Sequence, residues 1–320
     1  MPLTDLSLAA CREYAPDLAV PADFDAFWAR TLASDGAAPR LREVRTGLTR
    51  IRTFDVTVDG FGGEPVSGWL QVPAGVGGPL GCVVEYLGYS RGRGLAQEHL
   101  FWASAGYAHL VMDSRGQGWN TAPSTTPDPD GAVASAQPGV ITRGLDDPDR
   151  FYYRRLYTDA VRFAQAARAL PDVDPDRVAV AGGSQGGGLT LAVSGLVSGL
   201  AAAMPDVPFL CDFRRGVDVA SSGPYTEIAA HLALHRDAAA RAFATLAYFD
   251  GVTLAARATA PALFSIAMMD PICPPSTCFA AYNAYGGPKD VRVYEFNGHE
   301  GGGLRHRVTQ LEWLRERLSP

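Results

Sequence analysis

The chain has 320 residues, of which 47% are hydrophobic and 19% charged, a composition typical of a globular protein with a full core. The net charge of −6 is spread along the chain without a basic run, which argues against nucleic acid as a partner. The apolar runs are too short to cross a bilayer and no secretory signal is visible, so we expect a cytoplasmic protein with no membrane association.

The first part of the chain, residues 1–75, is predicted to form an N-terminal extension. It contains one amphipathic helix at residues 22–32, then strands at 52–58 and 67–72. From residue 82 on, apolar strands alternate with helices. The predicted strands span residues 82–87, 108–113, 177–181, 216–221, 262–268 and 291–296, and the predicted helices span 97–104, 152–169, 187–200, 277–285 and 304–318. This alternation predicts an α/β fold with a mainly parallel central sheet flanked by helices, in one domain over residues 1–320.

Two insertions interrupt this alternation. Residues 118–149 form a long loop rich in Pro, Gly, Asp and Ser, and such loops are usually functional or interface elements. Residues 224–250 add helical material between two strands. Inserts at the carboxyl ends of strands lie over the ligand crevice of an open α/β sheet, so this insertion is a candidate cap.

A candidate nucleophile lies between the strand at 177–181 and the helix at 187–200. Gly182, Ser184 and Gly186 match G-x-S-x-G, the nucleophile elbow of α/β-hydrolases. A strand that turns sharply into a helix holds the serine in a strained backbone, and side chains at either glycine would collide. A plain Gly/Ser turn is the alternative, but the flanking strand and helix favour a catalytic Ser184.

A catalytic serine needs a base, and His299 is the candidate. It follows the late strand at 291–296, in an Asn-Gly-His-Glu-Gly loop, and it fits the chain order Ser, Asp, His of this fold class. The other five histidines fall within predicted strands or helices: His99, His109, His231, His235 and His306.

The candidate acid is Asp270, which directly follows the strand at 262–268. Asp250 ends the inserted helices and Asp290 precedes a strand, so both fit less well; an acidic turn is the alternative for Asp270. Ser184, Asp270 and His299 would then meet at the carboxyl edge of one sheet. For the oxyanion hole we expect the N–H groups of Gln185, after the nucleophile, and of Tyr89, in the loop after an early strand, with a plain glycine loop as the alternative there.

The cysteines give no sign of a metal or a disulfide framework. Their number, five, is odd, and Cys273 and Cys278 show no further Cys or His partners in the nearby sequence. We therefore expect no metal and no other cofactor.

Six segments together carry a family resemblance. They are residues 88–94 (Gly-Tyr-Ser-Arg-Gly-Arg-Gly), 112–118 (Met-Asp-Ser-Arg-Gly-Gln-Gly), 182–188 (Gly-Gly-Ser-Gln-Gly-Gly-Gly), 249–251 (Phe-Asp-Gly), 269–277 (Met-Asp-Pro-Ile-Cys-Pro-Pro-Ser-Thr) and 299–303 (His-Glu-Gly-Gly-Gly). In this combination the chain resembles the seventh carbohydrate-esterase family, which contains acetyl xylan esterases and cephalosporin-C deacetylases. The resemblance covers nearly the whole chain.

The resemblance implies an α/β-hydrolase fold and a serine esterase that removes acetyl groups from sugar hydroxyls and small acetate esters through an acetyl-enzyme. The residues that it assigns as nucleophile, base, orienting acid and oxyanion hole are those named above: Ser184, His299, Asp270, Tyr89 and Gln185.

The same resemblance implies roles outside the triad. Arg115 and Gln117 would be structural support near the site, and Pro224 would line the pocket. The protein would form a homo-oligomer, a ring-like hexamer, in which the loop at residues 118–149 narrows the entrance. The sequence departs from the family pattern at Arg91, where glycine is expected, and this departure bears on pocket charge and substrate preference.

Two other functions stay open at this point. One is another α/β-hydrolase, of the dienelactone-hydrolase or peptidase-like kind, and the other is a catalytically silent fold that serves as a binding module. The Arg-Gly-Gln and His-Glu pairings favour the esterase over the first, and the complete candidate triad favours it over the second.

Overall fold

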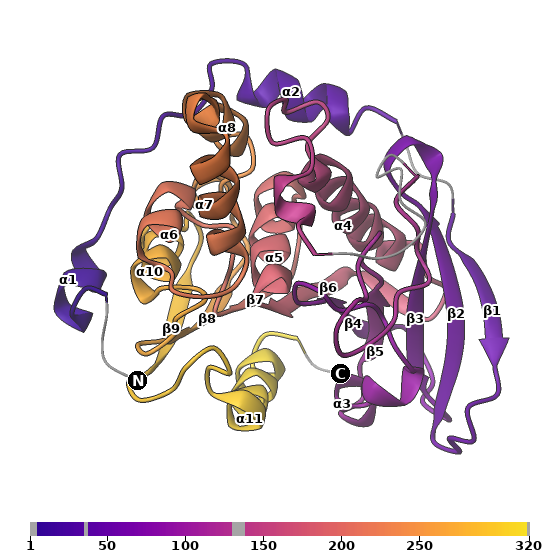
Figure 1. Ribbon diagram of the computed structural model, residues 1–320. Coiled ribbons are helices and arrows are strands. Elements are labelled where there is room, and N and C mark those ends of the chain that lie inside the picture. Colours follow the sequence, from indigo (N-terminus) through magenta and orange to yellow (C-terminus); the bar gives the residue numbers. More distant parts are fainter. Residues whose placement is uncertain (1–4, 35–37, 130–137, 319–320) are drawn as a thin grey trace.

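The computed structural model describes residues 5–34, 38–129 and 138–318, and these residues form one nine-stranded sheet with helices on both faces (Figure 1). The predicted α/β fold is therefore confirmed. Residues 130–137, part of the predicted interface loop, lie outside the described residues. Within the described part of the chain, no helix combines the length and apolar character needed to cross a membrane.

The sheet is antiparallel at one side and parallel over the rest. Its strands are β1 (Arg40–Val44), β2 (Ile51–Asp59), β3 (Pro65–Pro73), β4 (Leu80–Tyr86), β5 (Ala108–Met112), β6 (Val173–Gly183), β7 (Ala202–Asp206), β8 (Ala262–Ala267) and β9 (Lys289–Tyr294), in the order β1-β2-β3-β5-β4-β6-β7-β8-β9. The pairs from β1 to β3 and the β3–β5 pair are antiparallel, and every pair from β5 to β9 is parallel. The carboxyl ends of the parallel strands therefore share one edge of the sheet.

The helices connect and cover these strands. The α-helices are α1 (Leu8–Glu13), α2 (Phe24–Thr31), α3 (Phe101–Ser104), α4 (Tyr152–Arg168), α5 (Gln185–Leu196), α6 (Phe213–Val219), α7 (Pro224–Leu234), α8 (Ala239–Leu246), α9 (Gly251–Ala255), α10 (Pro275–Ala284) and α11 (Gly303–Arg315). Short 3₁₀ turns are η1 (Phe61–Gly63), η2 (Ala96–Glu98), η4 (Val140–Thr142) and η5 (Arg236–Ala238). The predicted helical insertion at 224–250 is thus present as α7 and α8.

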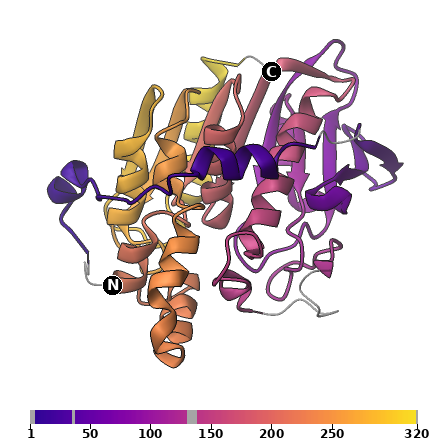
Figure 2. The same ribbon diagram turned by 90° about the horizontal axis from the view of Figure 1, so that it is seen from above.

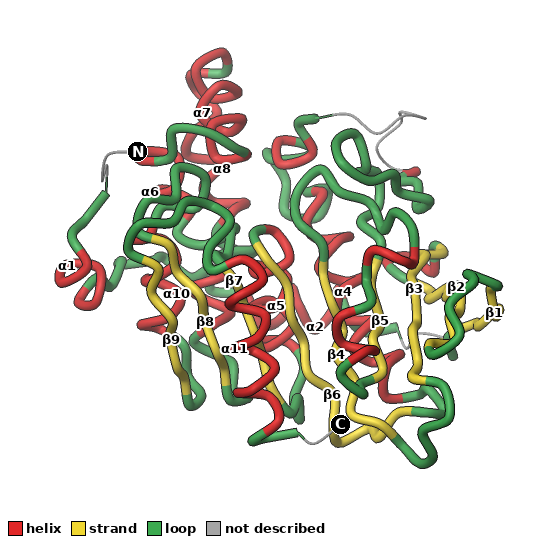
Figure 3. The backbone as a smooth tube through the Cα atoms, turned by 90° about the horizontal axis from the view of Figure 1, so that it is seen from below, coloured by secondary structure: helices red, strands yellow, loops and turns green. Residues whose placement is uncertain are grey.

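Alternation along the central strands produces a separate apolar core on each face of the sheet. Val84 and Val180 belong to the larger core, which α4 and α5 cover, whereas Val83 and Ala179 belong to the smaller core under α3 and α11. Figure 3 shows α11 lying across the sheet on this second face. Because both faces are covered, the central strands are apolar throughout.

The N-terminal segment crosses the helices of the larger core (Figure 2). The ring of Trp28 in α2 stacks on Tyr157 in α4, with centroids 5.8 Å apart, and its Nε1–H donates to the carbonyl of Tyr248. Burial of such aromatic side chains ties α2 to the domain.

One predicted strand is wrong. Residues 216–221 are not a strand, because α6 occupies Phe213–Val219; the strand at this place in the sheet is β7, Ala202–Asp206. Val217 and Val219 alternate with other residues as they would in a strand. Asp212 nevertheless caps a helix here, because its side chain accepts a hydrogen bond from the N–H of Arg215. The sequence of β7, Ala-Ala-Met-Pro-Asp, has no β-branched residue and gave no strand signal.

Candidate active site

Ser184 lies at the turn between β6 and α5 in a strained backbone. Its φ of 58° and ψ of −119° fall in a region that residues other than glycine rarely adopt. The backbone is held there because the Ser184 N–H donates to the Asp206 carbonyl and the Ser184 carbonyl accepts from the N–H of Phe209. Strain of this kind, maintained by surrounding structure, is typical of functional sites.

The two elbow glycines are required by space. A Cβ at Gly182 would lie 2.6 Å from the backbone of Gly186, and a Cβ at Gly186 would lie 2.1 Å from the carbonyl oxygen of Tyr86 in β4. Neither position has room for a side chain. The steric interpretation of the G-x-S-x-G pattern therefore agrees with the packing.

Asp270 and His299 are paired as the chain order predicts. The Oδ2 atom of Asp270 lies 2.8 Å from Nδ1 of His299, and its Oδ1 accepts from the N–H groups of Ile272 and Cys273. Asp270 is buried, and the His299 side chain is 25% exposed. A buried carboxylate with this many donors is fixed in position and orients the imidazole.

The loop that carries His299 is held by its neighbour. Glu300 accepts from the side chain of Asn297 and from the N–H of Gly298, and the Asn297 contact lowers the pKa of the Glu300 carboxyl. The His-Glu pairing in the sequence therefore has a structural reason, since the glutamate closes the turn that presents the histidine.

Gln117 connects the two segments that carry the predicted oxyanion donors. Its side-chain Oε1 accepts from the N–H of Ser90, next to Tyr89, and its Nε2 donates to the side chain of Gln185 at 2.8 Å. It also donates to the Tyr152 hydroxyl. Gln185 begins α5, where backbone N–H groups lack intrahelical partners. Contacts of this kind would hold the two segments together, and the role of Gln117 as structural support stays a prediction.

Arg115 is fully buried and forms an ionic cluster beneath the site. It donates to both carboxylate oxygens of Asp159 and to Glu64, at 2.5 to 2.9 Å. Burial raises the pKa of Asp159 although Arg115 opposes the shift. Loss of Arg115 would leave the buried Asp159 carboxylate without its ion pair. Arg115 is not among the described residues that line the cavity around Ser184, and its role as structural support stays a prediction.

Pro224 occupies the first turn of α7 and is buried. It is not among the described residues that line the cavity around Ser184, so its role in the pocket stays a prediction. The same helix carries Glu227, which accepts from the Tyr89 hydroxyl at 2.6 Å. This hydrogen bond ties α7 to the predicted oxyanion loop. Burial raises the pKa of the Glu227 carboxyl.

Cys273, for which the nearby sequence shows no further Cys or His partner, lies beside Asp270 and His299 in the structure. Its thiol is buried, and its Sγ, an Asp270 oxygen and a His299 nitrogen lie within 4.8 Å of one another, an arrangement that could hold a metal ion. Burial raises the pKa of the Cys273 thiol, and the Asp270 charge adds to the shift while a hydrogen bond with Ser184 opposes it. The contact between Asp270 and His299 is the arrangement that a hydrogen-bonded catalytic triad requires. The only signal in the sequence was its closeness to Asp270.

Ser184 and His299 line one cavity of about 480 Å³ at the carboxyl edge of the sheet. Its described lining also includes ionisable side chains from several elements: Glu85, Arg91, Asp206, Glu300, His306 and Arg307. The structure therefore brings the candidate nucleophile and base to a shared space large enough for a small ligand.

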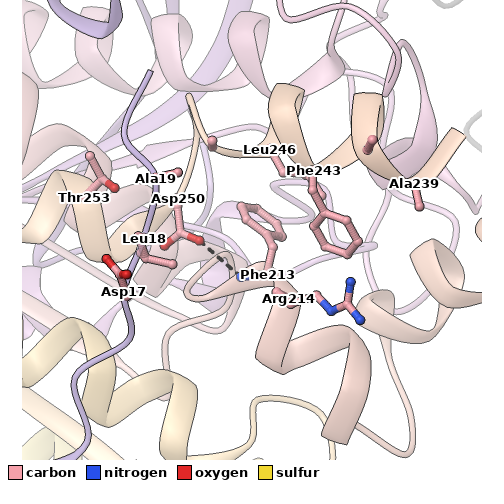
Figure 4. Close-up of a pocket in the computed structure, with 12 residues that line it drawn as sticks. Asp17, Leu18, Ala19, Phe213, Arg214, Ala239, Phe243, Leu246, Asp250 and Thr253 are labelled. Carbon is pink, nitrogen blue, oxygen red and sulfur yellow. Dashed lines mark hydrogen bonds between the residues drawn. The ribbon is translucent and has the colours of Figure 1, made fainter. Parts of the chain in front are cut away.

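A second cavity, of about 410 Å³, lies between the N-terminal segment and helices α6, α8 and α9 (Figure 4). The rings of Phe213 and Phe243 lie on its wall, and Asp250 accepts from the N–H of Phe213 there. None of the described residues lining it belongs to the triad. Because the candidate nucleophile and base line the other cavity, this one is a poor candidate for the chemistry.

Comparison with known proteins matches the chain to esterases. The chain matches the family model for acetyl xylan esterase (AXE1) over residues 1–317. It is 40% identical to the solved acetyl xylan esterase from Paenibacillus sp. R4, over 98% of this chain and 100% of that one, with a TM-score of 0.90. Acetyl xylan esterase 1 from Thermoanaerobacterium sp. JW/SL YS485 is 32% identical over 97% and 99% of the two chains, with a TM-score of 0.87.

More distant relatives are also found. The acetyl esterase Axe7A of Xylanibacter ruminicola is 27% identical over 93% of this chain and 67% of its own length. An acylaminoacyl peptidase of Pyrococcus horikoshii, at 15% identity and a TM-score of 0.57, shares the fold alone. These neighbours confirm the predicted α/β-hydrolase fold.

Proposed function

The chain belongs to the acetyl xylan esterase family and is a carboxylic ester hydrolase, and from this premise we propose that it removes acetyl groups from acetylated xylo-oligosaccharides and from small acetate esters such as cephalosporin C. One observation carries the proposal. The Asp270–His299 pair, at 2.8 Å, lines the same edge of the sheet as the strained Ser184, and Ser184 and His299 face one cavity.

In the proposed mechanism Asp270 accepts from Nδ1–H of His299, which leaves Nε2 free to act as base. Ser184 Oγ attacks the acetyl carbonyl carbon while His299 takes the hydroxyl proton. The tetrahedral oxyanion accepts from the N–H groups of Tyr89 and Gln185. When the intermediate collapses, the C–O bond to the sugar breaks and His299 gives its proton to the departing alkoxide.

The second half of the cycle releases acetate. Water attacks the acetyl-enzyme while His299 again takes a proton, and the proton then returns to Ser184 Oγ. The nearby Cys273 thiol does not compete with Ser184 as a nucleophile, because its raised pKa keeps it protonated and the thiolate is the reactive form.

The test is hydrolysis of p-nitrophenyl acetate, butyrate and octanoate by the wild type, Ser184→Ala and the exposed control Ser104→Ala. We expect acetate to be preferred and Ser184→Ala to lose about 10⁴-fold or more in rate, with Ser104→Ala unchanged. Acetate release from acetylated xylo-oligosaccharides and cephalosporin C follows. Retained activity in Ser184→Ala would refute the mechanism, and equal rates on acetyl and octanoyl esters would refute a small acyl pocket.

Two further proposals concern assembly and location. Family membership supports a homo-oligomer, a hexamer by resemblance, which light scattering would reveal as six times the 34.0 kDa chain mass. Five free, buried cysteines fit the reducing cytoplasm, and cell fractionation tests that location. A monomer, or the protein outside the cytoplasmic fraction, would contradict them.

A further inference from the structure

Arg91 is a cation in the wall of the catalytic cavity with almost no partner of its own. Its Nε is buried and forms no hydrogen bond with the described residues. Its Nη2 lies 3.5 Å from an oxygen of Glu98, and both side chains are about two-fifths exposed, 42% and 40%. An ion pair this long and this exposed contributes little, so most of the hydrogen-bonding capacity of Arg91 is available.

The neighbouring Arg93 shows what a structural arginine in the same loop looks like. Its guanidinium is buried, donates to Asp55 and to the carbonyl of Gly68, both at 2.7 Å, and lies 4.1 Å from the ring centre of Trp69. Two arginines two residues apart thus have opposite surroundings. Its contacts within the fold account for an arginine at position 93, whereas no comparable contacts in the described part of the chain account for an arginine at position 91.

The loop holds Arg91 in a defined place. The Arg91 N–H donates to the carbonyl of Gly88, Ser90 has a φ of 71°, and the Gly92 N–H donates to the carbonyl of Ala122. A side chain on Gly92 would collide with Ser124, whose N lies 2.1 Å from the Cβ position. Because this backbone is fixed, Arg91 is presented to the cavity without a large entropic cost to its main chain.

The carboxylates that line the cavity each have close polar partners. Burial would raise the pKa of Glu85, but Arg307 and His109 keep it well below its usual range. The remaining carboxylates have these partners: Asp206 has His306 and Gln310, and Glu300 has Asn297 and Gly298. The Arg91 guanidinium, by contrast, has only the long contact of 3.5 Å with Glu98 among the described residues.

We propose that Arg91 is a specificity-determining residue that binds a carboxylate on the alcohol part of the substrate, so that the enzyme prefers acetate esters of acidic molecules such as uronic-acid sugars. A guanidinium matches a carboxylate with two parallel hydrogen bonds, which suits recognition at a cavity wall. The inference rests on the proposed function, because the ester is cleaved at Ser184 in the same cavity.

The experiment compares matched acidic and neutral acetate esters. One pair is a mono-acetylated methyl glucuronoside and its primary amide, and the other is 3-acetoxybenzoate and 3-acetoxybenzamide. The enzymes are the wild type, Arg91→Met, Arg91→Lys and the exposed control Arg12→Met. For each enzyme the ratio of kcat/KM for the acid to that for the amide is measured, and comparing ratios between enzymes cancels the intrinsic reactivity of the esters.

We expect Arg91→Met to lower this ratio by about fivefold to thirtyfold, through KM, with the neutral esters changed less than twofold. Arg91→Lys should keep part of the preference because it keeps the charge, and Arg12→Met should keep all of it. Glu98→Gln preserves the Oε1 acceptor for the Leu95 N–H but removes the competing charge, so it should raise the ratio. The wild-type preference should also weaken with salt.

The outcomes are distinct. Discrimination in the glucuronoside pair supports a sugar acid, and discrimination in the benzoate pair alone supports a non-sugar acid. Equal changes of kcat/KM for the acid and the amide in both pairs on Arg91→Met would overturn the proposal. This is also the result expected if Arg91 only stabilises the loop. If the wild type cleaves none of the four acetate esters, the proposed esterase function fails instead.

Discussion

Replacing Gly186 by alanine tests whether the elbow is held by steric exclusion. The added Cβ would lie 2.1 Å from the carbonyl oxygen and 2.8 Å from the carbonyl carbon of Tyr86. Both atoms are backbone in β4, which pairs with β5 on one side and β6 on the other, so neither can move as a flexible side chain would. Ordinary contact begins near 3.4 Å, and α5 or β4 must therefore shift by about 1 Å.

Two effects of opposite sign compete in this variant. Alanine is favoured over glycine in a helix by about 1 kcal/mol, which alone would stabilise α5. Overpacking a close-packed site costs about 1–3 kcal/mol. We expect the overlap to dominate, because 2.1 Å is far inside contact distance and the neighbour is fixed. The free energy of unfolding should fall by about 1–2 kcal/mol.

The effect on rate should be larger than the effect on stability. Gly186 is two residues after Ser184, so a shift at Gly186 also displaces Ser184. A displacement of about 1 Å in a catalytic group lowers the rate by about 10²-fold. The assays are urea unfolding and p-nitrophenyl acetate hydrolysis. Gly183→Ala is the stability control, since its Cβ would meet only Asp206 Cβ at 3.9 Å, and we expect a change below about 0.5 kcal/mol. A Gly186→Ala enzyme as stable and as fast as the wild type would refute the steric argument.

Two other perturbations follow from the described contacts. In Asp270→Asn the amide would face Nδ1 of His299 and favour the wrong tautomer, so kcat should fall by about 10³- to 10⁴-fold while the exposed control Asp176→Asn keeps its rate; a fall below tenfold would remove Asp270 from the mechanism. Burial raises the pKa of Asp250 to about 7, although three backbone N–H groups oppose the shift. The unfolded carboxyl titrates near pH 4, so between about pH 4 and 7 the folded chain binds the extra proton, and the free energy of unfolding should fall as pH rises, by at most about 4 kcal/mol. Asp250→Asn should flatten that slope in denaturant titrations at several pH values, and an unchanged slope would show that another group causes it.

The catalytic candidates could be predicted because their signals are local. Gly182 and Gly186 are required by contacts within a few residues of Ser184 and with the adjacent strand β4, and such close contacts leave a mark in the sequence. Asp270 and His299 each follow an apolar strand, and parallel strands bring their carboxyl ends to one edge. The alternation of strands and helices likewise predicted the layered α/β fold.

The misplaced strand at residues 216–221 shows where local signals fail. The segment Ala202–Asp206 becomes β7 because β6 and β8 provide partners on both sides and both faces are covered, not because its residues favour a strand. Ala202 belongs to the smaller core and Ala203 to the larger one.

Only the tertiary structure decided the surroundings of the site. Gln117 bridges Ser90 and Gln185, and Cys273 lies beside His299, through contacts between segments far apart in the chain. Arg91 and Arg93 look alike in the sequence, yet one is buried on Asp55 and the other faces the cavity. Chain periodicity determines which residues form strands and turns, whereas the partner of each polar side chain depends on which segments the fold packs together.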